Sequence, residues 1–225
     1  MPVMEPNGPS RPAPNPAPEA GLSPRMESLV AAAQTVFLSK GYHNATMSDI
    51  ARQAGMSKRT VYTLVNSKVE LFAELLAHRK SKVQFPTPAP DEPVAETLCN
   101  NLLCLAKFLL DPVQIAISRM VITEFGHNPE FSTIFLSARM RKAQSHIENC
   151  LLELAFSGGA SREDARESAA MLFGMALGDF VFSTLSGFRA MPSLKAVEDR
   201  IRASVSIFLA GCAAKYVCHP PVTDI

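Results

Sequence analysis

Apolar residues recur every three or four positions along nearly the whole chain, and this helical period limits the folds open to it. In the first such run, Leu29, Val30, Ala33, Val36 and Phe37 mark one face of a helix. No segment alternates apolar and polar residues as a half-buried strand does. The sequence therefore predicts an all-α protein of about nine helices. The first expected helix ends at Gly41, and the fourth begins after Ser67. The other expected helices span about 46–54, 57–65, 94–109, 112–124, 129–155, 161–186 and 193–216.

Two proline-rich stretches divide the chain. Residues 1–24 contain eight prolines and no apolar run, so we expect a disordered tail there. A second proline cluster at 86–93 interrupts any helix and marks a boundary. Residues 25–82 hold nine Lys/Arg and four Asp/Glu, whereas residues 83–225 hold twelve and fifteen. A small basic domain is thus followed by a larger acidic one, which favours a polyanion as the partner of the first domain.

Composition excludes several classes of protein. Hydrophobic residues make up 47% of the chain, which is enough for a packed core. Its five cysteines form no C-x-x-C pair and its five histidines show no metal spacing, so we expect no metal and no cofactor. No secretion signal is visible at the N-terminus. The segment nearest to a membrane span, Ser168–Phe188, carries Asp179 in its middle. We interpret it as a buried helix of a soluble, cytoplasmic protein.

The basic domain contains two short helices around the turn Ala54-Gly55-Met56-Ser57. Thr46 and Asp49 have the spacing of a capping box, and Gly55 permits the positive φ of a sharp turn. This spacing is typical of a helix-turn-helix, whose second helix can lie in the major groove of DNA. An ordinary helical hairpin with a solvated basic face has the same spacing. The polar residues expected on the second helix are Lys58, Arg59, Thr60, Tyr62 and Thr63.

Several segments of this domain resemble the TetR/AcrR family of bacterial transcriptional regulators. They are FLSKGY at 37–42, TMSDIARQAGMSKRTVY at 46–62, SK at 67–68 and LF at 71–72. The resemblance covers about residues 26–77. Leu64 and Val65 depart from it, because the family usually has His-Phe there, and one phosphate-contacting imidazole is lost. Further on, the stretch EFGHNPEF at 124–131 is similar to an AcrR-like subgroup.

The resemblance implies a set of DNA contacts. Thr46, Tyr62 and Lys68 would contact phosphates, and Thr60 a phosphate or a base. Ser48, Lys58, Arg59 and Thr63 would lie at base edges. Physical chemistry agrees for Arg59, because a guanidinium can bind guanine through two hydrogen bonds. The implied partner is double-stranded DNA with a palindromic operator, bound by a homodimer.

The resemblance also implies that residues 83–225 form a ligand-binding and dimerisation domain. Gly174 and Gly178 lie four apart inside a helix, where each costs about 1 kcal/mol relative to Ala, so we expect another helix to approach them closely. With Ile201, Val205 and Phe208 they predict a dimer interface of four helices; close packing within one subunit is the alternative. Soft apolar side chains suit a ligand pocket but equally suit a core. The pocket candidates are Leu102, Phe108, Met120, Phe125, Phe135 and Met140.

Together these features predict a sequence-specific DNA-binding regulator. The expected mechanism is repression, with release from the operator when an unknown small apolar or amphipathic ligand binds. An activator or a ligand-independent regulator has the same sequence features. A helical interaction or ligand-binding module without DNA activity is a further alternative, which the basic residues Lys58, Arg59 and Lys68 disfavour. No G-x-S-x-G, Walker A or G-x-G-x-x-G segment is present, so the sequence does not support an enzyme.

Overall fold

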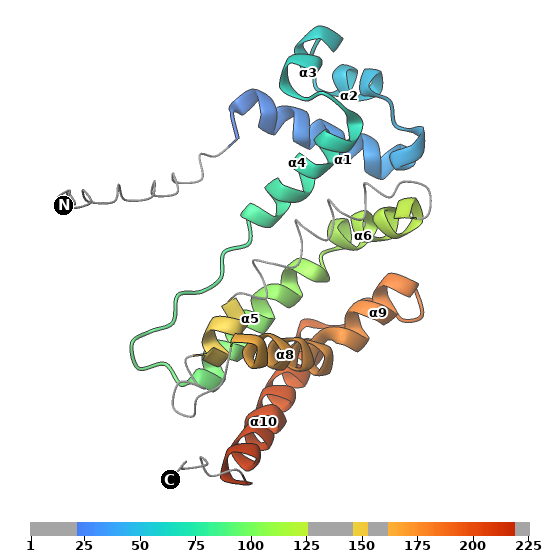
Figure 1. Ribbon diagram of the computed structural model, residues 1–225. Coiled ribbons are helices and arrows are strands. Elements are labelled where there is room, and N and C mark those ends of the chain that lie inside the picture. Colours follow the sequence, from blue (N-terminus) through green and yellow to red (C-terminus); the bar gives the residue numbers. More distant parts are fainter. Residues whose placement is uncertain (1–21, 126–145, 153–161, 219–225) are drawn as a thin grey trace, which may run out of the picture.

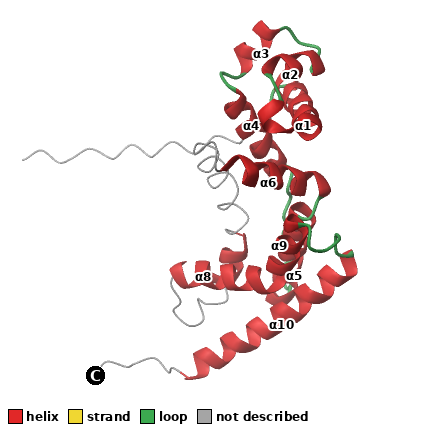
Figure 2. Ribbon diagram, turned by 90° about the vertical axis from the view of Figure 1, so that its right-hand side faces the viewer, coloured by secondary structure: helices red, strands yellow, loops and turns green. Residues whose placement is uncertain are grey.

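The computed structural model describes residues 22–125, 146–152 and 162–218, and within these ranges it contains helices and no strand (Figures 1 and 2). A continuous helix spans α8, η1 and α9. With it counted once and the helical residues 146–152 included, the described ranges hold nine helices, as predicted. The tail and most of the helix expected at 129–155 lie outside these ranges. The bounds are α1 Pro24–Asn44, α2 Met47–Gln53, α3 Lys58–Leu64, α4 Lys68–Ser81, α5 Val94–Leu109, α6 Pro112–Phe125, α8 Arg162–Phe173, η1 Gly174–Gly178, α9 Asp179–Ser186 and α10 Leu194–Cys218.

The first four helices pack around a small aromatic core. The rings of Phe37, Tyr42 and Phe72 have centroids 5.4–5.5 Å apart, and all three side chains are buried. Gly41 has φ 75° and kinks α1 just before Tyr42, a backbone conformation that side chains other than glycine disfavour. The predicted break of the first helix at Gly41 is therefore confirmed, and it places Tyr42 in the core.

Helix α6 packs on this first core. Ile117 and Val121 are fully or almost fully buried in the same cluster as the apolar residues of α1 to α4. Helices α5 and α6 are bent by 67° relative to one another. At the bend, Asp111 Oδ1 accepts a hydrogen bond of 2.9 Å from the Gln114 backbone N–H, which caps the start of α6. The first core thus includes one helix from beyond the second proline cluster (Figure 1).

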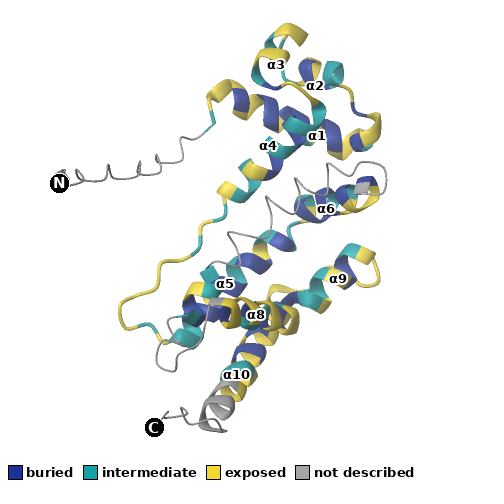
Figure 3. Cartoon of the chain, in the orientation of Figure 1, coloured by how far each residue is buried: buried dark blue, intermediate teal, exposed yellow. Residues whose placement is uncertain are grey.

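A second core lies among α5, α8, η1, α10 and residues 146–152. Leu98, Leu102, Leu172, Leu177 and Ile201 are at most 1% exposed there. The continuous helix Glu163–Ser186 has the length and hydropathy of a membrane span, but only 33% of its most apolar window is buried. The interpretation of this segment as a buried helix is thus correct for one face only, and Figure 3 shows the exposed face on α8.

Candidate nucleic-acid interface

Helices α2 and α3 form the predicted helix-turn-helix, at one end of the molecule (Figure 1). Thr46 and Asp49 form the predicted capping box at the start of α2, and Gly55 in the turn has φ 63°. Ser57 Oγ accepts a hydrogen bond of 3.0 Å from the Thr60 backbone N–H and so caps α3. Val61 is fully buried, and it anchors α3 on the core beneath.

The outer face of α3 is basic and open to solvent. Lys58, Arg59 and Thr63 are exposed, and Tyr62 is 53% exposed. Neither Lys58 nor Arg59 forms an ion pair with any described residue. An exposed guanidinium without a carboxylate partner keeps its donors available for an anion or a base edge. The helix thus presents two free cations on a rigidly anchored surface.

Three threonine hydroxyls of this region already have local hydrogen-bond partners. Thr46 Oγ1 donates to Asp49 Oδ2 over 2.8 Å, and Thr63 Oγ1 donates to the Thr60 carbonyl over 2.7 Å. The Thr60 hydroxyl lies 2.9 Å from Ser57 Oγ. Ser48 is half-buried. The Thr46 and Thr63 hydroxyls must leave a local acceptor before they can donate to DNA, whereas the two cations need not.

Asp49 fastens α2 to α1 as well as capping α2. Its Oδ1 lies 2.8 Å from Lys40 Nζ and 2.6 Å from Arg52 Nη2. The hydrogen bonds from Lys40 and then from Thr46 hold the pKa of Asp49 well below its usual range. The capping box was visible in the sequence, but the link to Lys40 on another helix was not.

Lys68 Nζ lies among backbone carbonyls, whereas the resemblance implied a contact with a DNA phosphate. Its Nζ donates to the carbonyls of Tyr42, His43 and Ala45 over 2.8, 3.3 and 3.0 Å, and lies 4.3 Å from the centroid of the Tyr42 ring. An ammonium group has three donors, so these carbonyls occupy all of them. Burial lowers the pKa of Lys68, while the negative charge of Glu124 opposes that shift. The side chain ties α4 to the segment that follows the kink of α1.

We expect Lys68→Met to destabilise the fold. The substitution leaves carbonyls without a donor, so the free energy of unfolding should fall by about 2 kcal/mol. Lys58→Met, which removes an exposed lysine without a partner, should change it by no more than about 0.5 kcal/mol. Urea unfolding followed by circular dichroism measures both. An unchanged midpoint for Lys68→Met, together with weaker DNA binding, would return Lys68 to the phosphate contacts.

The six pocket candidates do not come together in the described residues. Leu102 is fully buried in the second core, and Met120 packs against the first core. Phe108 lines a cavity between α1, α4 and α5. Phe135 and Met140 lie outside the described residues, as does the side chain of Phe125. The helical period had marked these positions as inward-facing, but it does not tell which core each side chain enters.

The dimer candidates divide into two groups. Ile201 and Val205 are 1% exposed, so they pack within their own subunit. Phe208 is partly buried against the same second core. A Cβ at Gly174 or Gly178 would meet no atom of a described residue within 4 Å. Within the described part of one subunit, close packing therefore does not explain either glycine. The exposed apolar side chains of this region are Met171, Met175, Phe182, Phe188, Met191, Leu194 and Ile207.

One polar cluster was missed from the sequence. Arg79 of α4 reaches Gln34 of α1, Gln114 of α6 and Asp111 at the bend, over 3.1, 3.2 and 2.6 Å. It therefore joins three helices that meet between the two cores. These partners lie 32 to 45 positions from Arg79, so no local pattern could have revealed them.

Comparisons with known sequences cover both halves of the chain. Residues 29–75 match a sequence model of bacterial regulatory proteins of the tetR family, and residues 96–214 match the C-terminal domain of AefR-like transcriptional repressors. The HTH-type transcriptional activator FasR of Mycolicibacterium smegmatis is 44% identical over 52 residues, 23% of this chain and 24% of FasR. The HTH-type regulator TtgW of Pseudomonas putida is 34% identical over 58 residues, 26% of this chain and 43% of TtgW. The matched parts are thus less than half of either curated relative.

Solved structures extend the likeness to the whole fold. A TetR-family regulator from Mesorhizobium loti superposes with a TM-score of 0.70 at 24% identity, over 83% of this chain and 96% of that one. A TetR regulator from Agrobacterium tumefaciens has a TM-score of 0.71 at 23% identity, over 84% and 94%. Both share the helix-turn-helix domain followed by a helical C-terminal domain. The chain therefore belongs to the TetR family of bacterial regulatory proteins.

Proposed function

We propose that this regulator is a repressor, bound to a palindromic operator as a homodimer and released when a small apolar or amphipathic ligand enters its C-terminal domain. Regulators of this family bind DNA and act as dimers. The match to the AefR-like repressor domain supports repression. The observation that carries DNA binding is that Lys58 and Arg59 on the anchored α3 are exposed and form no ion pair with a described residue. With regulators as its relatives, we assign the chain no enzymatic activity and a place in the bacterial cytoplasm.

The exposed end of α3 is the part that we assign to base edges. Arg59 and Lys58 lie in its first turn, and Arg59 is suited to bidentate contact with guanine. We assign Thr63 and Ser48 to neighbouring base edges, and Thr46, Thr60 and Tyr62 to phosphates. Lys68 is left out of this set, because three carbonyls already hold its ammonium.

The dimer interface that we propose is the outer face of the continuous helix and of α10. Met171, Met175 and Phe182 follow the helical spacing of Gly174 and Gly178, and their side chains are 56%, 39% and 63% exposed. On α10, Ile207 is 64% exposed. A partner subunit that covers this face would bury the apolar area and meet the glycines closely, which is the usual reason for such an exposed patch. It would also explain the membrane-like hydropathy of the helix.

Helix α6 is the element that we expect to carry the ligand signal. It contributes Ile117 and Val121 to the core of the DNA-binding domain, while its Arg119 donates to the carbonyls of Thr184 and Leu185 at the end of α9 over 2.7 and 2.9 Å. A shift of α6 therefore moves the DNA-binding domain relative to the dimerising helices. In a dimer this changes the separation of the two α3 helices, and with it the affinity for the operator.

Activation is the second candidate, because the relative FasR is named as an activator. A reporter gene behind the operator distinguishes the two signs of regulation. Deletion of the regulator should raise expression if it represses and lower it if it activates.

The DNA-binding role is tested with a duplex from the DNA flanking its own gene. We expect binding that is much tighter than to random DNA and that weakens steeply with salt, because phosphate contacts release counterions. Fluorescence anisotropy over a salt series measures it. If the flanking DNA binds no better than random sequence, selection from random duplexes finds the operator. Failure of that selection would contradict the proposal.

A further inference from the structure

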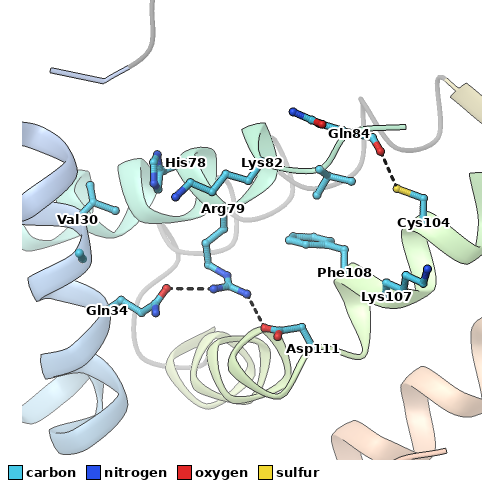
Figure 4. A pocket seen from close by; sticks show the side chains of 12 residues that line it. Val30, Gln34, His78, Arg79, Lys82, Gln84, Cys104, Lys107, Phe108 and Asp111 are labelled. Atoms are coloured by element: carbon cyan, nitrogen blue, oxygen red, sulfur yellow. Dashed lines mark hydrogen bonds and ion pairs between the residues drawn. The ribbon is translucent and has the colours of Figure 1, made fainter. Parts of the chain in front are cut away.

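A cavity of about 560 Å³ lies between the two cores, where α1, the end of α4 and the end of α5 meet (Figure 4). Its volume is within the range of small-molecule sites. Two walls come from the DNA-binding domain and the third from the C-terminal domain. A ligand in this cavity would therefore contact both the DNA-binding domain and the C-terminal domain.

Positive charge dominates the lining. Lys82, Arg79 and Lys107 line the cavity together with the imidazole of His78, and Asp111 is the only carboxylate among the described lining residues. Asp111 already binds Arg79 over 2.6 Å. No described carboxylate forms an ion pair with Lys82 or Lys107. A concave surface of one charge sign concentrates the opposite ion, so this lining favours an anion.

Apart from Gln34 and Gln84, the remaining described lining is apolar. Phe108 faces the cavity from α5 and Val30 faces it from α1 (Figure 4). Val83, which follows the end of α4, also lines it. An inorganic anion would leave these side chains in contact with water. An anion with an apolar body would cover them, which makes an amphipathic organic acid the better fit.

Arg79 connects the cavity with the fold. Its guanidinium uses three of its five N–H donors, on Gln34, Gln114 and Asp111. Two donors thus have no partner among the described residues. A carboxylate that takes these two donors shares the charge of the guanidinium with Asp111 and so weakens its bond to Asp111, whose Oδ1 also caps α6. Occupation of the cavity therefore acts on the start of the helix that links the two cores.

We infer that this cavity binds an organic carboxylate with an apolar body through Lys82, Lys107 and Arg79, and that binding loosens the joint between α4 and α6 and weakens DNA binding. The effect on DNA rests on the proposed function, but the binding itself does not.

Binding is measured first, without DNA, by titration calorimetry with octanoate and 1-naphthoate. The neutral amides of the same acids are the ligand controls. We expect at least one acid to bind and its amide to bind roughly tenfold more weakly or not at all. The double variant Lys82→Gln/Lys107→Gln should weaken the acid roughly tenfold. The double variant Arg166→Gln/Lys195→Gln removes two exposed cations outside the lining and should leave the affinity unchanged.

The outcomes separate this inference from the proposed function. No heat from either acid, or equal binding by wild type and Lys82→Gln/Lys107→Gln, would overturn the carboxylate site while operator binding still stands. Where the acid binds, operator affinity is then measured with and without it. An unchanged operator affinity would overturn the coupling and leave the site. If no operator is found, the proposed function fails, yet the calorimetry still decides the site.

Discussion

Arg59→Ala should lower the affinity for the operator by roughly 5- to 150-fold, which corresponds to the 1–3 kcal/mol that a bidentate contact to a base contributes. Arg59 lies in the first turn of α3, is exposed, and forms no ion pair with a described residue. Its removal therefore breaks no contact that holds the fold. Anisotropy titrations of operator and random duplexes, run side by side, measure the change.

The comparison of the two duplexes distinguishes a base contact of Arg59 from a phosphate contact. Binding to random DNA depends on phosphate contacts, so loss of one charge should reduce it only slightly and lower the salt slope by about one. The matched control is Arg166→Ala, an exposed arginine on α8 far along the chain from the helix-turn-helix. An equal loss on both duplexes would make Arg59 a phosphate contact. No loss on either would move sequence reading to Lys58 or Thr63.

The parts of the site that the sequence predicted are those fixed by local chemistry. Thr46 and Asp49 lie three positions apart and form their capping box within one turn of helix. Gly55 takes its positive φ within a turn of four residues. Such features depend on neighbours in the chain, so a residue pattern is sufficient to find them.

The parts that the sequence could not predict depend on contacts between distant segments. Lys68 was expected at a phosphate, but its partners are carbonyls 23 to 26 positions earlier. No charge pattern marks a backbone carbonyl as a partner. Arg79 likewise meets α1 and α6 across the joint between the cores. A long cationic side chain can bind DNA, cap a helix end or join two helices, and the packing determines which of these contacts it makes.

The last helix shows the same difficulty for apolar residues. Val205 and Ile207 are two positions apart, so they lie about 200° apart around α10. Val205 is 1% exposed and Ile207 is 64% exposed. Both sides of the helix thus carry a large apolar side chain at this point, and the helical period alone does not tell which one faces its own subunit. The sequence analysis therefore placed Ile201 and Val205 in the dimer interface, although both side chains are buried in their own subunit. Gly174 and Gly178 of the neighbouring helix have no described neighbour within 4 Å of a Cβ.

Ile207→Glu should separate the dimer into monomers. If the partner covers this face, the substitution buries one carboxylate from each subunit without a partner. At about 2–3 kcal/mol per group, two copies raise the dissociation constant of the dimer by roughly 10³–10⁴. Sedimentation velocity over a range of protein concentrations measures this. The monomer should also lose most of its operator affinity, because a single helix-turn-helix reads only one half-site.

The chain offers a matched control for this substitution. Ile122 on α6 is 60% exposed, close to the value for Ile207, but lies on a different helix from the proposed interface. Ile122→Glu should leave the sedimentation coefficient unchanged. If both variants stay dimeric, the subunits meet elsewhere, and the open glycines Gly174 and Gly178 need another explanation. If only Ile207→Glu dissociates, the outer face of α10 holds the dimer together, while Ile201 and Val205 stabilise each subunit from within.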